Sequence, residues 1–280
     1  MTNLVDQERT TVAPGKSAAP PARRAGRARP TVSAGAPMMS FLVLLGVWWL
    51  VTAQGWVDRL FLPGPDAVLE RLSELSSSGE LWDDLGVSVY RVGVGFLLAT
   101  ALALPLGILM GRFTLWAAFA EPVIDFIRYM PVVAFVPLTI LWVGTDDGQK
   151  FLIIFIGTFF QQVLLFTDNV RRVPGELVDV GRTLGLTRQQ ILRRIVLRAG
   201  APGLWDSLRV SLGWAWTWLV VAELVAATSG LGYRITLAQR YLSTETIIGY
   251  LLVLGLLGLV TDQLLRRAGI LLFRPSESNQ

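Results

Sequence analysis

Five charged residues interrupt stretches that are otherwise apolar, and they are the first candidates for chemistry: Asp125, Arg128, Asp206, Arg209 and Glu223. A charge at the centre of a bilayer costs about 2.5–3.5 kcal/mol on insertion scales, so it normally faces a protein interior, a cavity or a partner. Asp206 and Arg209 are three residues apart, which predicts an ion pair on one helix face. Arg128 and Glu223 are candidates for a translocation pathway, with a salt bridge between helices as the alternative role.

The residue types that are absent narrow the chemistry further. The sequence has no His and no Cys, and its two Lys are Lys16 and Lys150. This excludes Ser-His-Asp triads, HExxH zinc sites and cysteine nucleophiles. Carboxylates such as Asp125 and Glu223 remain as an acid–base pair, but two acids in different apolar segments do not define an active site. No strand followed by GxxxxGK[ST] occurs, so no nucleotide-binding, cofactor-binding, metal or catalytic residue is predicted.

The composition predicts an all-α, polytopic membrane protein. Of the 280 residues, 52% are hydrophobic and 16% are charged, whereas a soluble domain carries about 25% charged residues. Six segments are expected to cross the membrane, namely residues 38–53, 87–110, 115–144, 151–169, 203–227 and 246–265. The first is expected to anchor the chain rather than to be cleaved as a signal peptide.

The third apolar segment contains three prolines, Pro122, Pro131 and Pro137. Each removes a backbone donor and bends a helix. Such breaks are tolerated at membrane depth only against protein or a water-filled cavity. Pro131 and Pro137 therefore join Arg128 and Glu223 as candidate pathway residues.

The segments outside the spans differ in character. Residues 1–37 are rich in Ala, Pro, Gly and Arg and predict a disordered cytoplasmic tail, and residues 271–280 predict a second tail. Residues 38–270 form the expected transmembrane domain. Within the acidic stretch 55–86, apolar residues at helical spacing after Pro63-Gly64-Pro65 predict an amphipathic helix at the membrane surface.

The distribution of basic residues predicts the orientation. With the amino terminus in the cytoplasm, 17 of the 25 Lys and Arg residues lie on the cytoplasmic side and six on the opposite side. Cytoplasmic loops carry an excess of Lys and Arg, so both termini are expected in the cytoplasm. The net positive charge of the chain follows from this excess of cytoplasmic Lys and Arg and does not indicate nucleic-acid binding.

The longest hydrophilic segment between spans covers residues 171–202 and predicts two short helices. The first covers about 176–184, and the second begins at Thr187, where Thr187 and Gln190 match a capping box. Between them, Gly185 permits a positive φ. The residues alone leave two interpretations open: a helical hairpin that rests on the membrane, or a docking surface for a cytoplasmic partner.

This segment resembles the EAA loop of ABC importer permeases. The resemblance is carried by Asp179-Val180-Gly181, by Gly185, and after nine further residues by Ile195 and Leu197. Asp179 replaces the usual glutamate, Val180 and Gly181 replace alanines, and Arg198 stands where proline is usual.

Further short motifs follow one another in the order found in the nitrate/sulfonate/taurine permease subfamily, across about residues 40–270. They are Leu62-Pro63-Gly64-Pro65, Arg128-Tyr129-Met130-Pro131, Val136-Pro137, Leu141-Trp142-Val143-Gly144, Arg182-Thr183-Leu184-Gly185, Ala222-Glu223-Leu224 and Ser229-Gly230-Leu231-Gly232-Tyr233.

The resemblance implies a type I ABC importer permease fold and the transport subunit of an ATP-driven importer in a bacterial cytoplasmic membrane. The implied solute is a small, mostly anionic one, such as a sulfonate, taurine, nitrate or a related organic acid. The implied partners are a second permease subunit in a homodimer, two cytoplasmic ABC ATPase subunits and an extracytoplasmic solute-binding protein. ATP and Mg would be bound by the ATPase and not by this chain.

The resemblance also implies a role for the loop at about residues 175–202, which would couple the permease to the ATPase. The residues expected to take part are Asp179, Gly181, Thr183, Leu184, Gly185, Leu186, Ile195 and Leu197. The alternative function is an ion-coupled secondary transporter that acts without an ATPase, with its ion site at Glu223 and the broken third segment. An aromatic vestibule formed by Trp142, Trp214, Trp216 and Trp218 is a further hypothesis.

Overall fold

The computed structural model describes residues 35–273, and among these residues it contains helices and no β-strand. The helices are α1 (Gly35–Ala53), α2 (Pro65–Ser77), α3 (Glu80–Arg112), α4 (Thr114–Arg128), α5 (Val136–Val143), α6 (Asp147–Arg171), α7 (Gly175–Thr183), α8 (Arg188–Ile191), α9 (Leu197–Ala226), α10 (Leu231–Arg240) and α11 (Thr244–Leu272), with a 3-10 turn η1 (Val132–Phe135) and a π-helical segment η2 (Leu192–Val196). The all-α prediction is confirmed.

The chain divides after Leu44 into two compact units, and the elements discussed below lie in the second unit. The predicted tails, 1–37 and 271–280, fall mostly outside the described residues. The expectation of disordered tails stays a prediction; among the described residues, α1 begins at Gly35 and α11 continues to Leu272.

Four helices in the described part of the chain are long and apolar enough to cross a membrane. They are Glu80–Arg112, Asp147–Arg171, Arg188–Val225 and Thr244–Leu272, and they correspond to the predicted second, fourth, fifth and sixth spans. Each begins before its predicted start, because polar residues at the start of a span remain helical. Three also extend past their predicted ends, whereas Arg188–Val225 stops just short of residue 227. The predicted first span is a shorter apolar helix, Met38–Ala53.

The predicted third span is a broken one. Helices Thr114–Arg128 and Val132–Val143 bend by 88° at a short break that contains Pro131. The prediction of three breaks was wrong for the other two prolines. Pro122 lies inside α4, and Pro137 lies in the first turn of α5, where its missing N–H has no helical acceptor to lose.

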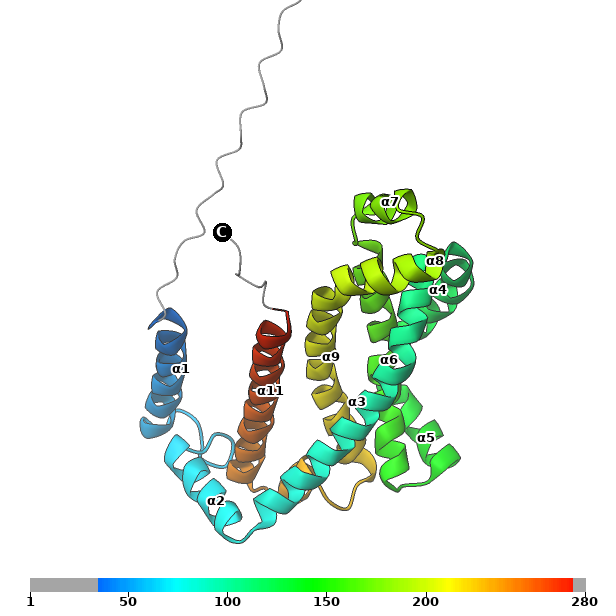
Figure 1. Cartoon of the computed structure of the whole chain (residues 1–280). Coiled ribbons are helices and arrows are strands. Elements are labelled where there is room, and N and C mark those ends of the chain that lie inside the picture. Colours follow the sequence, from blue (N-terminus) through cyan, green and yellow to red (C-terminus); the bar gives the residue numbers. More distant parts are fainter. Residues whose placement is uncertain (1–34, 274–280) are drawn as a thin grey trace, which may run out of the picture. The chain divides into compact units, whose positions relative to one another are not determined.

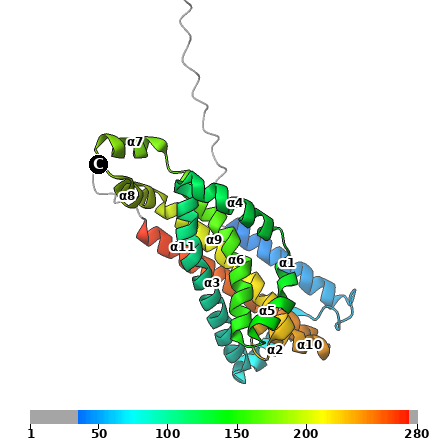
Figure 2. The same cartoon turned by 90° about the vertical axis from the view of Figure 1, so that its right-hand side faces the viewer.

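The core of the molecule is the contact between α3, α6 and α9, which lie side by side in Figure 1 and Figure 2. Two glycines of α3 allow α6 to approach closely. A Cβ on Gly95 would lie 2.8 Å from Ile154 Cβ, and a Cβ on Gly107 would lie 2.6 Å from Phe166 Cβ. Small residues at helix contacts are a common means of packing in membranes.

Polar side chains reinforce the same contact. Gln162 of α6 is fully buried, and its Nε2 donates to Thr100 Oγ1 of α3 at 3.0 Å and to Ser211 Oγ of α9 at 3.1 Å. This amide therefore joins all three helices. The frame places α7 and α8 at one end of the α3–α6–α9 core and α2 and α10 at the other, as both views show.

Candidate functional site

The hydrophilic segment between α6 and α9 folds as predicted up to Thr187. Helix α7 ends at Thr183, and Thr187 then caps α8 with the predicted capping box. Gln190 N donates to Thr187 Oγ1 at 3.3 Å, and Thr187 N donates to Gln190 Oε1 at 2.9 Å. Both exchanged hydrogen bonds of the motif are present, so the prediction is confirmed.

The prediction of a short second helix was wrong. Helix α8, η2 and α9 follow one another without interruption, and Arg188–Val225 is one helix of 38 residues. Pro202 lies inside it and removes only one donor, so it does not end the helix. The predicted loop helix and the predicted fifth span are therefore parts of the same element.

The turn between α7 and α8 is a compact C-terminal cap. Gly185 has a φ of +72°, a conformation that residues with a Cβ resist. Leu186 N donates to Gly181 O at 3.0 Å, and Gly185 N donates to Arg182 O at 3.0 Å. This pair of bonds defines a Schellman motif, which satisfies the last carbonyls of α7.

Helix α7 packs on the start of the long helix through a glycine. A Cβ on Gly181 would lie 2.5 Å from Ile195 Cδ1, so the position allows a close helix contact. Val178 and Ile191 are buried nearby, and Ile195 and Leu186 pack against the same cluster, whereas Leu197 is half-buried. Leu186 therefore faces the protein, although Leu184 and Leu186 were both expected to contact a partner.

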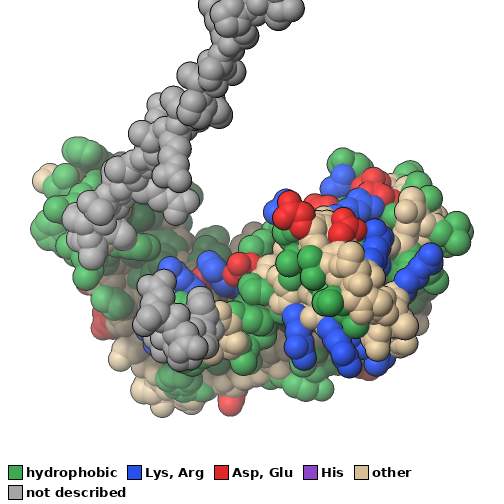
Figure 3. Space-filling view, turned by 45° about the horizontal axis from the view of Figure 1, so that its top comes forward, with side chains coloured by type: hydrophobic (Ala, Val, Ile, Leu, Met, Phe, Trp, Pro, Cys, Tyr) green, Lys and Arg blue, Asp and Glu red, His purple; other side chains and the backbone are tan. Residues whose placement is uncertain are grey.

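The outer face of α7 is apolar with charges of both signs. Leu177, Val180 and Leu184 are 43%, 56% and 72% exposed. Asp179 Oδ1 accepts from Arg182 Nη1 at 2.9 Å, and both side chains are exposed. Figure 3 brings this end of the molecule forward and shows apolar side chains beside basic and acidic ones. Apolar surface of this kind at the end of a membrane protein is suited to contact a second protein.

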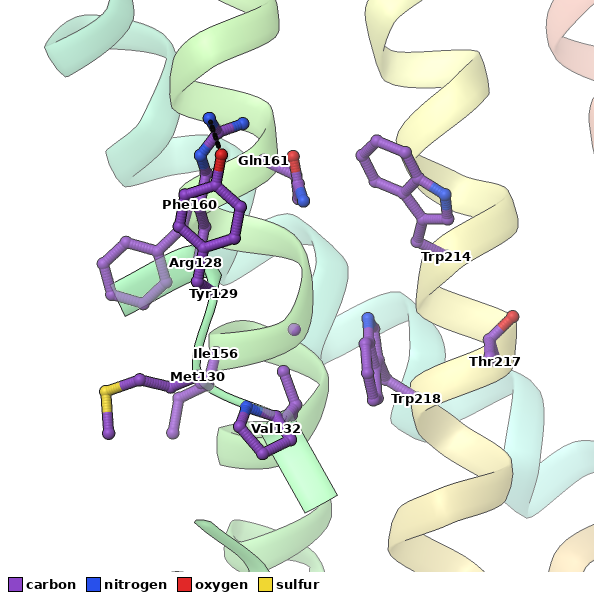
Figure 4. Close-up of a pocket in the computed structure, with 12 residues that line it drawn as sticks. Arg128, Tyr129, Met130, Val132, Ile156, Phe160, Gln161, Trp214, Thr217 and Trp218 are labelled. Carbon is purple, nitrogen blue, oxygen red and sulfur yellow. Dashed lines mark hydrogen bonds between the residues drawn. The ribbon is translucent and has the colours of Figure 1, made fainter. Parts of the chain in front are cut away.

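Arg128 lies on the wall of a cavity of about 370 Å³. The cavity is lined by Arg128, Tyr129, Met130, Pro131, Val132, Ile156, Gly157, Phe160, Gln161, Trp214, Thr217 and Trp218. The wall thus combines the break of the third span with α6 and α9 (Figure 4). The predicted pathway residues Arg128 and Pro131 are brought together here, whereas Pro137 is not part of the lining.

Arg128 is held by its neighbours at the cavity wall. Its Nε lies 3.0 Å from Asp125 Oδ1 in a salt bridge, and its Nη2 donates to the Tyr129 hydroxyl at 3.0 Å. The guanidinium carbon also lies 4.7 Å from the centre of the Tyr129 ring, within the range of a cation–π contact.

Glu223 lies in a different place, in a buried polar cluster that joins α3, α9 and α10. It is 1% exposed, and its Oε1 accepts from Arg91 Nη1 at 2.8 Å. Ser88 Oγ donates to both carboxylate oxygens, and Gly232 N donates to Oε2 at 2.8 Å. The structure therefore gives Glu223 the salt bridge between helices that was the alternative to a pathway role.

The same cluster continues through Arg91 to the other elements. Arg91 Nη1 also donates to Ser229 O at 2.7 Å, and its Nε donates to Asp147 Oδ1 at 2.7 Å. Asp84 accepts from Gly230 N at 3.0 Å and from Tyr250 Oη at 2.9 Å. Sequence reasoning missed Asp84, which precedes the predicted span 87–110 at the polar start of α3, and Arg91, which lies near the start of that span.

The described chain matches a family of known transport proteins. The sequence model of the family described as binding-protein-dependent transport system inner membrane component matches residues 103–268, which is more than half of the chain. The chain belongs to this family. It is a multi-pass permease of the nitrate, sulfonate and taurine type.

Relatives and solved structures agree with this assignment. A probable ABC transporter permease protein of Brucella melitensis is 40% identical over 84% of this chain and 94% of the relative. A putative aliphatic sulfonates transport permease protein of Bacillus subtilis is 34% identical over 80% of this chain and 81% of the relative. The inward-facing MetNI methionine ABC transporter matches with a TM-score of 0.61 and 19% identity, over 69% of this chain and 96% of that chain. This likeness shows the importer permease fold.

In this permease, the predicted ion pair of Asp206 with Arg209 was wrong. Arg209 Nε donates instead to Asp262 Oδ1 of α11. The residues lie on neighbouring helices, α9 and α11, and Trp216 Nε1 of α9 donates to Thr261 Oγ1 of α11 at 3.1 Å beside them. A spacing of three residues brings two side chains near each other but does not exclude a partner on another helix.

The four tryptophans of the proposed vestibule separate into two groups in the permease. Trp214 and Trp218 line the cavity beside Arg128. Trp216 is buried on another side of α9, and Trp142 is exposed on α5 outside the lining. Two of the four therefore share the cavity.

Proposed function

We propose that this permease is the translocation subunit of an ATP-driven importer for a small organic anion, of the class formed by sulfonates, taurine, nitrate and related organic acids. The observation that carries the proposal is the compact cap at Gly185, which presents Leu184 and the outer face of α7 at one end of the long helix Arg188–Val225. Because the outer face of α7 is joined to this long helix, a partner that moves α7 would also move the membrane-spanning part of the chain.

The proposed assembly contains two copies of this chain, two cytoplasmic ABC ATPase subunits and an extracytoplasmic solute-binding protein. ATP and Mg are bound by the ATPase, and this chain binds neither. Both termini are assigned to the cytoplasm, and so is the segment that contains α7. This assignment is supported by the seven arginines among residues 171–198, which the positive-inside rule assigns to the cytoplasm.

In the proposed mechanism, Leu184, Val180 and Leu177 contact a cleft of the ATPase, and closure of the ATPase dimer moves α7. Asp179 lies on the same face and is placed to meet a basic group of the partner. Gly181 and Ile195 hold α7 against the long helix, so a movement of α7 is passed to α9. Thr183 supports the end of α7, since its hydroxyl donates to Val180 O at 2.8 Å.

The test is a substitution at the turn with a matched control on the same helix. Gly185→Asp places a side chain where φ is +72°, and we expect it to distort the cap. Gly175→Asp adds the same charge at the start of α7, where a Cβ meets no atom within 4 Å. Both variants should insert normally into the membrane, because neither position faces the packed core.

The measurement is ATP-dependent uptake and ATP hydrolysis in vesicles that contain the reassembled complex. We expect Gly185→Asp to lose uptake while hydrolysis continues, and Gly175→Asp to behave as the unmodified protein. Unchanged uptake by Gly185→Asp would refute the coupling role. Uptake by the purified chain alone, driven by an ion gradient without any ATPase, would instead establish a secondary transporter.

A further inference from the structure

Three hydrogen-bond donors on the cavity wall have no partner among the residues that the structure describes. They are the amide of Gln161 and the indole N–H groups of Trp214 and Trp218. In Figure 4, Trp214 and Trp218 project from α9 toward α6, and Gln161 projects from α6 toward Trp214. Other tryptophans donate to protein acceptors, as Trp205 Nε1 does to Leu265 O at 2.8 Å. The cavity therefore collects donors that have no acceptor within the described protein.

Arg128 adds a cationic donor to the same wall. Its Nε forms a salt bridge with Asp125 and its Nη2 donates to the Tyr129 hydroxyl, whereas a guanidinium carries five N–H groups. Donors therefore remain for a ligand. Asp125 offsets the charge but does not line the cavity, so the lining itself carries Arg128 without an acidic residue.

Aromatic and apolar side chains form the rest of the wall, chiefly Phe160, Val132 and the faces of the two indoles. The position of one indole depends on a glycine. A Cβ on Gly157 would lie 2.3 Å from Trp218 Cδ1, so only glycine leaves the ring its present place. The width of the cavity at this point is therefore set by the contact between Gly157 and Trp218.

We propose that this cavity is a binding subsite for an organic sulfonate within the permease itself. Arg128, Gln161 and the indole N–H of Trp214 donate to the sulfonate oxygens, and the rings of Trp214 and Trp218 contact the carbon chain. The chemistry fits because a sulfonate offers three acceptor oxygens and no donor, and the wall offers donors beside aromatic faces. This inference rests on the proposed function for its choice of solute class, and it makes the permease a second point of selection after the binding protein.

The test measures equilibrium binding to the full chain in lipid nanodiscs, by the change in tryptophan fluorescence. The probes are 1-pentanesulfonate, 1-pentanol, which lacks the acid, and inorganic sulfate, which lacks the chain. We expect saturable binding of 1-pentanesulfonate and at least tenfold weaker binding of the other two. Arg128→Gln should weaken binding of 1-pentanesulfonate by about tenfold, as expected for the loss of a charged hydrogen bond.

The matched control for Arg128→Gln is Arg171→Gln. Arg171 is also paired with a carboxylate, that of Glu121 at 3.2 Å, but lies outside the cavity, so binding should not change. Trp214→Phe keeps the aromatic volume and removes the donor, and it should weaken binding while Trp142→Phe does not. Gly157→Ala displaces Trp218 and should weaken the binding of 1-pentanesulfonate more than the binding of the smaller methanesulfonate. A general loss of folding would weaken the binding of both ligands equally.

Equal affinity of the unmodified chain, Arg128→Gln and Trp214→Phe would overturn the subsite, and so would the absence of any binding of 1-pentanesulfonate. The assay contains no ATPase, so either result leaves ATP-driven import to be judged by the uptake measurement. Conversely, uptake without an ATPase would refute the proposed function and leave a measured subsite in place.

Discussion

Arg91 and Glu223 are separated by 132 positions in the sequence, and their side chains meet at 2.8 Å in the interior of the protein. The arginine side chain is 5% exposed and the glutamate side chain is fully buried. The pair therefore joins α3 to α9 where solvent does not screen it.

We expect Arg91→Met to be strongly destabilising, by about 3–5 kcal/mol, because it leaves the Glu223 carboxylate buried without its cation. Adding Glu223→Leu removes the second charge and should restore most of the lost stability. Thermal unfolding in detergent measures both effects. Arg71→Met is the control, since Arg71 and Glu74 form an exposed pair on one helix. Similar unfolding temperatures for Arg91→Met and Arg71→Met would contradict the prediction.

Gly230 presents a second test of the same cluster. It has a φ of +105°, and a Cβ there would lie 2.3 Å from Glu223 Oε1. Gly144 also has a positive φ, of +78°, but a Cβ there meets no atom within 4 Å. Gly144→Ala should cost about 1 kcal/mol for its backbone conformation, and Gly230→Ala should cost clearly more. Equal decreases in unfolding temperature for the two variants would show that the close approach of Gly230 to Glu223 does not affect stability.

The capping box predicts a local effect at the turn. Thr187→Ala removes the acceptor for Gln190 N and should cost about 1 kcal/mol at the start of the long helix. Faster hydrogen exchange of the amides at 189–191 is the expected signal. Thr183→Ala is the control, because its hydroxyl bonds to carbonyls inside α7 rather than to an amide of the capping turn. No difference in exchange between the two variants would argue against the cap.

Asp179 permits a test that separates docking from folding. Its pair with Arg182 is exposed on both sides, and such pairs contribute about 0–1 kcal/mol. Asp179→Asn should therefore leave thermal unfolding unchanged and weaken binding of the ATPase subunit, as measured by copurification at increasing salt. Asp168→Asn is a matched control on α6, away from the outer face of α7. Normal ATPase retention by Asp179→Asn would remove this residue from the proposed docking surface.

Because Arg209 pairs with Asp262 and not with Asp206, substitutions of these two aspartates should affect stability differently. Asp262→Asn breaks the observed contact between α9 and α11, whereas Asp206→Asn affects a residue with no ion pair in the described structure. We expect a lower unfolding temperature for Asp262→Asn only. The reverse order would support the ion pair within one helix that the spacing predicted.

Sequence patterns over a few neighbouring residues predicted the spans, a helix start and a turn correctly. The apolar stretches located four spans, and the Thr187 to Gln190 spacing located a helix start to the residue. The glycine at position 185 predicted a positive φ because a tight turn has few alternatives there. Each of these features is set within a few residues of chain.

The same patterns did not predict which residues from distant segments contact each other. Nothing near Arg91 in the sequence indicates that Glu223 is its partner, and Arg209 was assigned to its helix neighbour Asp206 for the same reason. The three prolines were treated alike, although only Pro131 lies at the bend. Whether a proline bends a helix depends on where the helix begins, and tertiary packing decides that.

The uninterrupted course of the helix from Thr187 to Val225 has a consequence for communication across the bilayer. At about 1.5 Å per residue, Trp214 stands roughly 40 Å along the axis from the capped start. The helix is not a straight rod, because Figure 1 shows α8 running across the top of the vertical α9. A displacement of the capped start therefore reaches the tryptophan wall around this turn, along a continuous helix without an intervening loop. In the proposed importer, the capped turn beside α7 and the tryptophan wall of the cavity therefore belong to one continuous helix.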